Sequence, residues 1–324
     1  MELLYGLAPL IIGFILLVKG ADVFVDGASG LALKLGIPPL IIGLTVVALG
    51  TSAPEAAISI SSSAQEAEGI AIANVLGSNT MNTLVVLGAV AMIAEIPIRS
   101  STFKVEIPFV LVITLLLLAL CASDGVLDRR DALVLLAFLG IYIAYLAFLA
   151  HRGNEPEEEM SLALVAAAGG GEHAGEKTIK RLLLLIALGI FGIALGSNLA
   201  VGGATALARV FGVSDRVIAL TIVAFGTSLP ELATSIAAAR KGETDIAIGD
   251  IVGSSIFNIL FVLGVSGTIS PLAFAQELVL DGLVALAAAV VLWVACFRTR
   301  SLRRGWGAAM LVGYMTYLSY LLVG

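Results

Sequence analysis

Long uninterrupted apolar stretches constrain the fold of this 324-residue chain more than any other feature. No charged residue occurs in the runs 107–122, 132–150, 182–195 and 283–297. A membrane-spanning helix needs about 20 predominantly apolar residues, and ten such segments fit along the sequence. Transmembrane β-strands would alternate polar and apolar residues, which these runs do not. The sequence therefore predicts an all-α integral membrane protein that has the lipid bilayer as its solvent.

The composition supports this prediction and excludes one class of partner. Hydrophobic residues make up 59% of the chain and charged residues 13%, whereas soluble domains carry about 25% charged residues. The formal net charge is -6, and no basic patch of the kind that marks nucleic-acid-binding proteins is present. We therefore expect no nucleic-acid partner, and the sequence indicates no protein partner.

The chain repeats itself at an offset of 176 residues, the separation of Glu55 and Glu231. The segment Leu44–Glu55 (LTVVALGTSAPE) aligns without a gap with Leu220–Glu231 (LTIVAFGTSLPE). The segment Ala71–Gly88 aligns in the same way with Ala247–Gly264. Apolar helices resemble one another by chance, but matched polar strings inside them do not. The two halves are therefore an internal repeat.

The repeat divides the chain into residues 1–150, a hydrophilic linker at 151–178, and residues 179–324. Hydropathy and helix breakers predict ten transmembrane helices, near 3–34, 38–64, 70–96, 104–122, 131–150, 179–210, 216–239, 245–268, 277–297 and 306–323. Because each half has an odd number of helices, the second half must enter the membrane from the opposite side. Two inverted five-helix repeats are an architecture of secondary transporters, whose site lies near the midplane.

The lysines and arginines predict the orientation, because cytoplasmic loops carry an excess of them. With the N-terminus outside, most of these residues fall inside. The exceptions are Arg129, Arg130, Arg209 and Arg216, which fall outside, and Lys19, which lies within a helix. We expect a multi-pass protein of the plasma (inner) membrane with a cytoplasmic 151–178 linker.

Each half carries the string Gly-Thr-Ser-x-Pro-Glu about halfway through a span, at Gly50–Glu55 and at Gly226–Glu231. Pro54 and Pro230 have no N–H and clash with the carbonyl four residues earlier, so they break both helices at the midplane. Irregular backbone at this depth is tolerated only where it faces protein or a water-filled cavity. Freed carbonyls, hydroxyls and a carboxylate are hard oxygen ligands, which suit Ca²⁺ and the similarly sized Na⁺.

The two motif glutamates have an alternative role as helix caps. Ser52 and Ser228 precede Glu55 and Glu231 at the spacing of a capping box. A carboxylate at the bilayer centre costs roughly 2.5 kcal/mol or more, whereas a cap contributes about 1 kcal/mol. The comparison favours cation ligands, and the same residues can also cap.

A second polar string, Gly-Ser-x-x-x-Asn, follows in each half, with Ser78 and Asn82 in the first and Ser254 and Asn258 in the second. Residues four apart share a helix face, so each pair can present oxygens to the broken helix. The alternative is that glycine and serine allow close helix approach and polar side chains join the helices. Duplication beside a duplicated glutamate favours the ligand role.

These strings resemble the two alpha-repeats of the cation/calcium exchanger superfamily, in its sodium/calcium exchanger branch. The resemblance implies that calcium and sodium share the two glutamates, and that motif hydroxyls and the carbonyls of Ala48 and Ala224 add oxygens. Asparagine at both Asn82 and Asn258 resembles potassium-independent transport. The candidate metal ligands are Ala48, Thr51, Ser52, Glu55, Ser78, Asn82, Ala224, Thr227, Ser228, Glu231, Ser254 and Asn258.

The expected function is secondary active exchange of Ca²⁺ for Na⁺ by alternating access, electrogenic if three or more Na⁺ balance one Ca²⁺. Proton-coupled exchange of Ca²⁺ or another cation is the alternative, and a cation channel is a more distant one. The sequence has no HExxH string and no phosphate-binding loop, so we expect no enzyme and no cofactor. The glycine-spaced helices near 3–34 and 179–210 are the candidates for the moving gate.

Overall fold

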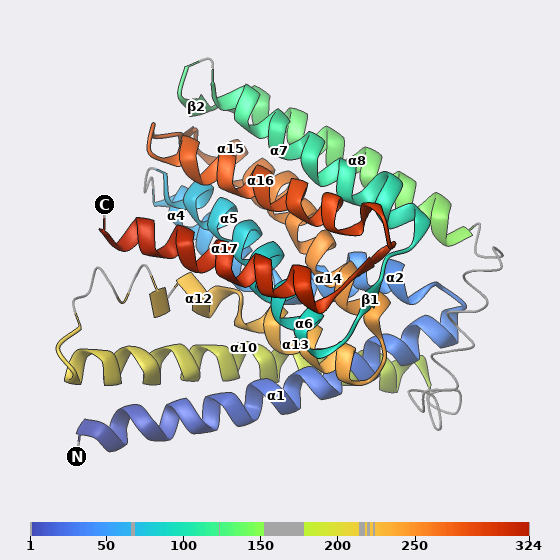
Figure 1. The fold of residues 1–324 in the computed structure, drawn as a ribbon, viewed down its shortest axis with the longest axis vertical. Helices are drawn as coiled ribbons and strands as arrows, with labels where there is room; N and C mark the ends of the chain where they lie inside the picture. The colour runs from blue at the N-terminus through green and yellow to red at the C-terminus, as the bar shows by residue number, and fades with distance from the viewer. Residues whose placement is uncertain are drawn as a thin grey trace.

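The computed structural model describes residues 2–65, 69–122, 124–151, 178–213, 218, 221–222 and 224–323. These residues are almost entirely helical (Figure 1), which confirms the all-α prediction. The 151–178 linker lies outside the described residues apart from His151 and Thr178.

The helices of the first half fall where hydropathy and the prolines predict them. They are α1 (Glu2–Leu35), α2 (Pro39–Ile42), η1 (Gly43–Val47), α3 (Ala48–Thr51), α4 (Ala53–Ala64), α5 (Ile70–Met81), η2 (Asn82–Val86), α6 (Leu87–Ile93), η3 (Thr102–Glu106), α7 (Ile107–Cys121) and α8 (Arg129–His151). The segments η1, η2 and η3 are π-helical turns that run on into the α-helices next to them.

The second half follows the same order at the repeat offset. It comprises α10 (Ile179–Val210), α12 (Ala224–Thr227), α13 (Leu229–Arg240), α14 (Thr244–Phe257), η5 (Asn258–Leu263), α15 (Gly264–Ile269), α16 (Leu278–Phe297) and α17 (Arg304–Val323). The π-helical turns η2 and η5 begin at Asn82 and Asn258, which are equivalent positions of the repeat.

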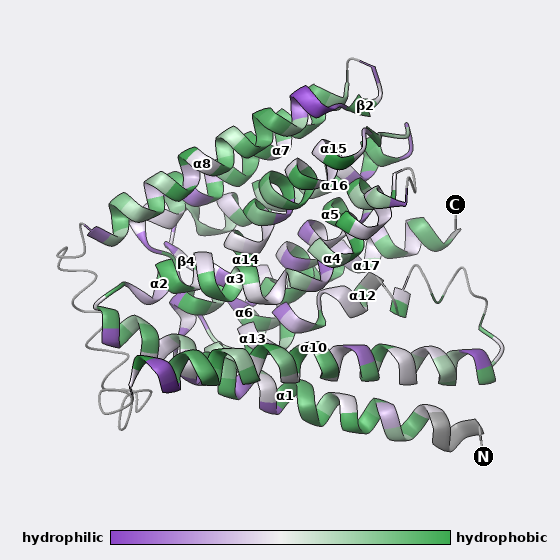
Figure 2. Ribbon diagram, turned by 180° about the vertical axis from the view of Figure 1, so that it is seen from behind, coloured by the Kyte–Doolittle hydropathy of each residue, from purple (hydrophilic) through white to green (hydrophobic). Residues whose placement is uncertain are grey.

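Seven of the described helical segments are long and apolar enough to cross a membrane, or eight if the bent pair Pro39–Thr51 and Ala53–Ala64 forms one span. Large apolar side chains also lie on the outside, where Ile141 of α8 is 62% exposed and Phe191 of α10 is 66% exposed. Figure 2 shows α7 and α8 as predominantly hydrophobic along their length. These features confirm a multi-pass membrane protein, while ten spans and an inverted arrangement remain predictions.

Two short antiparallel strand pairs join the halves. Strand β1 (Ile96–Pro97) pairs with β4 (Ser301–Leu302), and β2 (Val126–Leu127) pairs with β3 (Leu272–Ala273). Near the first pair, Arg99 forms an ion pair with Asp245 at 2.7 Å. Each strand pair therefore joins two loops that the distribution of lysines and arginines assigns to the same side of the membrane.

Helices α1 and α10 lie side by side along one face of the molecule, away from α7 and α8 (Figure 1). Glycines line their contact. A Cβ atom on Gly196 would lie 2.5 Å from the Leu17 amide nitrogen, and one on Gly20 would lie 2.7 Å from the Ile193 amide nitrogen. The two backbones approach this closely because neither position has a side chain.

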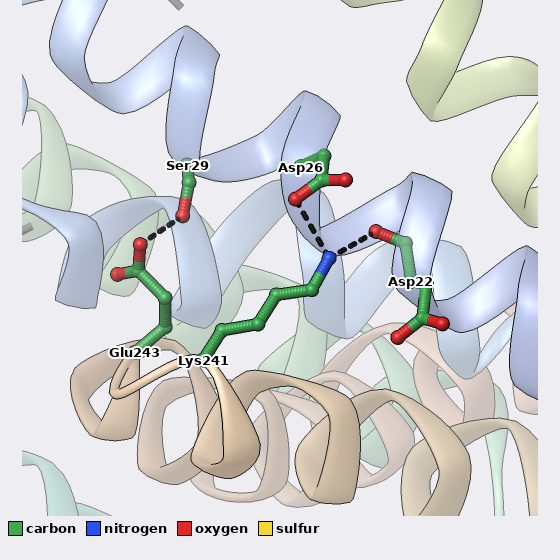
Figure 3. A network of polar contacts seen from close by, with 5 residues as sticks. All are labelled: Asp22, Asp26, Ser29, Lys241 and Glu243. Atoms are coloured by element: carbon green, nitrogen blue, oxygen red, sulfur yellow. Dashed lines mark hydrogen bonds and ion pairs between the residues drawn. The ribbon is translucent and has the colours of Figure 1, made fainter. Parts of the chain in front are cut away.

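Polar contacts tie α1 to the turn between α13 and α14 (Figure 3). The Lys241 ammonium donates to the Asp26 carboxylate at 2.6 Å and to the Asp22 carbonyl at 2.7 Å. The Ser29 hydroxyl donates to Glu243 at 2.6 Å. These contacts fix one end of α1 against the helices that carry the second motif.

Candidate functional site

The first motif occupies a sharp bend. The segments Pro39–Thr51 and Ala53–Ala64 meet at Ser52 with a bend of 50°. Pro54 lies in the first turn of α4. Its missing N–H costs no hydrogen bond there, because the N–H groups of the first turn have no partner within the helix. Glu55 also lies in this first turn, close to the positive end of the α4 dipole. The break therefore places the Glu55 side chain in the interior of the protein, where it is completely buried.

The second motif has the same local structure. Helix α12 ends at Thr227, and α13 begins at Leu229 after the non-helical residue Ser228. Glu231 lies in the first turn of α13 and is completely buried. Ala224 is the first residue of α12. Both halves thus place one glutamate at the start of a helix that follows a break.

Neither motif serine caps its helix. Ser52 and Ser228 occupy the N-cap positions of α4 and α13, yet neither side chain makes a capping hydrogen bond. The Ser52 hydroxyl instead donates to Glu231 of the other half, at 3.2 Å. The capping-box hypothesis is therefore wrong for these serines, because contacts between the halves replace the local pattern.

The two motifs converge on one buried site. Glu55 lies beside the hydroxyls of Ser78 and Thr227, and it is close enough to Glu231 for the two carboxylates to interact electrostatically. The Thr51 and Ser254 hydroxyls, one from each half, lie 3.4 Å apart. Ten of the twelve predicted residues are buried, the exceptions being the half-buried Thr227 and Ala224, whose side chain lies outside the described part of the chain.

Several polar atoms of this site have no hydrogen-bond partner among the described residues. They are both carboxylate oxygens of Glu55, Oε2 of Glu231, the Ser228 hydroxyl, both amide atoms of Asn82, and Oδ1 of Asn258. Buried polar groups are normally paired, and an uncompensated buried charge is strongly destabilising. Most of these atoms are oxygens, which are the ligands that hard cations take. The site is therefore suited to bind cations.

Asn258, the first residue of η5, lies where η5 meets Asn79 of α5. The Asn258 amide donates to the Asn79 side-chain oxygen at 3.1 Å, and the Asn79 amide donates to the Ser255 carbonyl at 3.1 Å. These bonds hold the Asn258 side chain by its nitrogen and leave its oxygen unpaired. The motif spacing did not single out Asn79, which holds the Asn258 side chain by this hydrogen bond.

A third buried acid, Asp250, lies in the same region and was missed by sequence reasoning. It accepts hydrogen bonds from the hydroxyls of Thr51 at 2.8 Å and Ser235 at 3.0 Å. The signal was present, since the repeat aligns Asp250 with Asn74 and α14 is otherwise apolar around it. Asp250 is completely buried within a candidate membrane span, and an ionisable residue in such a place is a functional candidate by default.

Among the described residues, no group of three or more His, Cys, Asp and Glu side chains is arranged to hold a metal ion. The candidate site differs from such a group, because hydroxyls, amides and backbone carbonyls supply most of its oxygens. Its suitability therefore rests on the combination of two carboxylates with many neutral oxygens.

A buried polar site at broken helices, inside a helical protein with several membrane spans, is typical of membrane transporters. The family model described as "Sodium/calcium exchanger protein" matches residues 5–149 and 181–323. The chain belongs to this family, and hence to membrane exchangers rather than enzymes.

Relatives and solved structures are similar over nearly the whole chain. The inner membrane protein YrbG of Escherichia coli is 37% identical over 98% of this chain and 97% of its own length. The sodium/calcium exchanger MaX1 of Methanosarcina acetivorans is 31% identical over 95% of this chain and 96% of its own. The structure of the sodium-calcium exchanger NCX_Mj soaked with 10 mM Na⁺ and no Ca²⁺ has a TM-score of 0.80 and 30% identity, and the match covers 98% of this chain and 99% of that one.

Proposed function

We propose that this protein is a secondary active antiporter that exchanges Ca²⁺ for Na⁺ by alternating access. One observation carries the proposal: Glu55 and Glu231, from separate halves, are buried in one site, and three of their four carboxylate oxygens have no partner among the described residues. The names of the relatives MaX1 and NCX_Mj, both sodium/calcium exchangers, support the same pair of ions.

The donor set fits these two ions. Ca²⁺ takes roughly 6–8 oxygens at about 2.3–2.6 Å, and carboxylates from both halves can share one divalent ion. The proposed ligands are Ala48, Thr51, Ser52, Glu55, Ser78, Asn82, Ala224, Thr227, Ser228, Glu231, Ser254 and Asn258. With asparagine at both amide positions, Glu55 and Glu231 are the two fixed charges of this set, which favours exchange that does not require K⁺.

Exchange rather than leakage follows from the charge of the empty site. Two uncompensated carboxylates are expensive to enclose in a low-dielectric interior. One Ca²⁺ neutralises them, and so do Na⁺ ions distributed over neighbouring oxygens. We propose that only a loaded site permits the conformational change, which couples the two fluxes. If three or more Na⁺ replace one Ca²⁺, each cycle also moves net charge.

The moving part in this proposal is the pair α1 and α10, which meet through glycines. The remaining helices carry the ligands. The whole chain has ten spans in this proposal, arranged as two inverted repeats. The N-terminus is outside and the linker is cytoplasmic, in the plasma (inner) membrane. The aligned motifs and the positions of the lysines and arginines support this arrangement.

The decisive experiment measures ⁴⁵Ca²⁺ uptake by purified protein in proteoliposomes, with Na⁺, K⁺ and proton gradients imposed one at a time. We expect uptake to follow the Na⁺ gradient alone and to respond to a membrane potential clamped with valinomycin. Uptake that follows the proton gradient without Na⁺ would instead establish proton coupling. Single-channel currents would contradict exchange altogether.

A further inference from the structure

We propose that Lys241 and Glu243 form a latch on α1, which holds the cytoplasmic side of the transporter closed. This inference rests on the proposed function, in which α1 and α10 move against the remaining helices, and it names the contacts that oppose the movement. The latch consists of two contacts (Figure 3). The Lys241 ammonium donates to the Asp26 carboxylate, and the Ser29 hydroxyl donates to the Glu243 carboxylate.

A glycine in the left-handed region shapes the turn that carries the latch. Helix α13 ends at Arg240, and Gly242 has a φ of 78°. The Gly242 amide donates to the Ala239 carbonyl at 3.1 Å, and the Glu243 amide donates to the Ala238 carbonyl at 2.8 Å. These two bonds close a Schellman motif. The turn thereby presents the side chains on both sides of this glycine to α1 (Figure 3).

The turn is anchored on the side away from α1. Asp245, two residues after Glu243, lies in the first turn of α14. It accepts two hydrogen bonds from the Arg99 guanidinium, at 2.7 Å and 3.0 Å. Arg99 follows strand β1, which pairs with β4. One half of the latch is therefore attached to the helices that the strand pairs connect, and the other half lies on the proposed moving helix.

The two contacts differ in strength. The side chains of Lys241 and Asp26 are 27% and 49% exposed, and exposed ion pairs contribute little. Ser29 and Glu243 are both buried, and a buried charged acceptor is costly to leave without its donor. We therefore expect the bond between Ser29 and Glu243 to provide most of the strength. Oε2 of Glu243 has no partner among the described residues, so water that enters on opening would recover part of the cost.

The repeat shows that the latch exists on one side only. At the repeat offset, the four latch positions fall on Gly202, Thr205, Gln65 and Ala67. None of these residues is charged, so the same ion pair cannot form between α10 and the first half. In an inverted repeat, the equivalent contact would close the outer side. The latch therefore favours a closed cytoplasmic side, and with it access from outside.

Two cysteine reporters measure this preference. The natural Cys121 and Cys296 are buried, so they contribute little background. Val25 is completely buried on α1, one turn before Ser29 and on the same helix face. Val201 is its equivalent on α10 and is partly exposed. Val25→Cys and Val201→Cys are prepared separately, and the rates at which they react with a water-soluble maleimide are measured in proteoliposomes.

Release of the latch should accelerate only the cytoplasmic reporter. In a Ser29→Ala background, Val25→Cys should react about tenfold faster, because only the closed state loses a hydrogen bond to a buried charge. In a Lys241→Met background, the increase should be about threefold, as expected for an exposed ion pair. The reaction of Val201→Cys should not become faster in either background, because alternating access does not open both sides together.

Two controls test the identity of the contacts. Arg240 is exposed, and its guanidinium forms no ion pair within the described part of the chain. Arg240→Met removes this neighbouring charge and should leave both reporter rates unchanged. Asp26→Asn should add little to the effect of Lys241→Met, because the two residues act as a pair. A further increase of similar size would contradict the ion pair.

Two other results would overturn the proposal. One is a Val25→Cys rate in the Ser29→Ala and Lys241→Met backgrounds that equals the rate with Arg240→Met. Another is equal acceleration of both reporters, which would show loosened packing instead of release on one side. Na⁺-driven ⁴⁵Ca²⁺ uptake by the otherwise wild-type protein is measured in parallel. Its absence would contradict the proposed function, whereas the reporter rates decide the latch without any ion gradient.

Discussion

The Ser52 hydroxyl donates a hydrogen bond to Glu231, with 3.2 Å between Oγ and Oε1. Ser52 belongs to the first motif and Glu231 to the second, 179 residues further along the chain. A serine at an N-cap position would ordinarily bond the backbone of its own helix. Here it bonds an acid of the other half, so neither half contains a complete site.

The first prediction concerns the two glutamates. Glu55→Gln and Glu231→Gln should each abolish ⁴⁵Ca²⁺ uptake, because each removes one of the two charges that a divalent ion would neutralise. The variants should remain folded, and their thermal midpoints should not fall, because an unpaired buried charge disappears. Uptake and midpoint are measured on the same preparations. Uptake at the wild-type level in either variant would remove the site assignment.

The second prediction concerns Asn258, whose amide nitrogen bonds Asn79 while its oxygen has no partner among the described residues. Asn258→Asp replaces that donor by an acceptor that faces the Asn79 oxygen, and adds a fixed charge. We expect uptake to become dependent on an additional monovalent cation, measured by varying K⁺ at constant Na⁺. Asn258→Leu removes the amide without adding charge and serves as the control. A cation profile identical to that of the wild type would contradict the ligand role.

The third prediction uses two adjacent glycines of α10. A Cβ atom on Gly203 would lie 2.5 Å from the Gly6 carbonyl oxygen and 2.6 Å from the Leu10 amide nitrogen, whereas one on Gly202 meets nothing within 4 Å. Gly203→Ala should therefore destabilise the protein by about 1–3 kcal/mol, as overpacking does, and slow transport. Gly202→Ala should behave like the wild type. The thermal midpoints and uptake rates of the two variants are compared. Equal values for Gly203→Ala and Gly202→Ala would show that α1 and α10 have room to separate.

The fourth prediction concerns pH. Burial raises the pKa of Glu243 above its ordinary value of 4.5, and the hydrogen bond from Ser29 opposes this rise. The folded protein then binds more protons than the unfolded chain above pH 4.5, so stability falls as pH rises through that window. Lys241, Asp26 and Asp245 are the charged groups that act on it.

Glu243→Gln keeps an acceptor for Ser29 and removes the titration. Its thermal midpoint should exceed that of the wild type at neutral pH, and the difference should shrink toward pH 4.5. Midpoints are compared at one scan rate, because membrane proteins of this size often unfold irreversibly. A constant difference across this range would show that burial of the carboxylate does not control its proton.

Much of the fold could be predicted from the sequence because bilayer spans have a strong local signal. The helices predicted at 104–122, 131–150, 179–210 and 277–297 match α7, α8, α10 and α16 within a few residues at each end, and Pro54 predicts the bend at Ser52. Strands β1 to β4 could not be predicted in this way. Each has two residues, and each pairs with a distant loop, so no hydrophobic alternation marks it.

The site was predictable to the extent that the repeat marks it. The duplicated strings led to Glu55, Glu231 and Ser254, whose burial and contacts follow from two similar halves meeting. Asp250 was missed because the same comparison favours positions where both halves agree. The hydrogen bond from Ser52 was missed because capping patterns describe neighbours along one helix. Both depend on how the two halves pack together, which is a tertiary property: Asp250 of α14 meets Thr51 of α3, and Ser52 meets Glu231 of α13.

The two strand pairs have a mechanical consequence. They tie the connections at the ends of α6, α7, α8, α15, α16 and α17 across the halves, which resists relative rotation of these helices. In the described part of the chain, α1 and α10 have no such tie to the rest. The glycine contact joins α1 and α10 closely, and the ion pair between Lys241 and Asp26 would have to break if the two helices moved together against the rest. If α1 and α10 are the moving part, as we propose, the helices linked by the strand pairs form the part that stays still, and the movement would run along the face that α1 and α10 present to those helices.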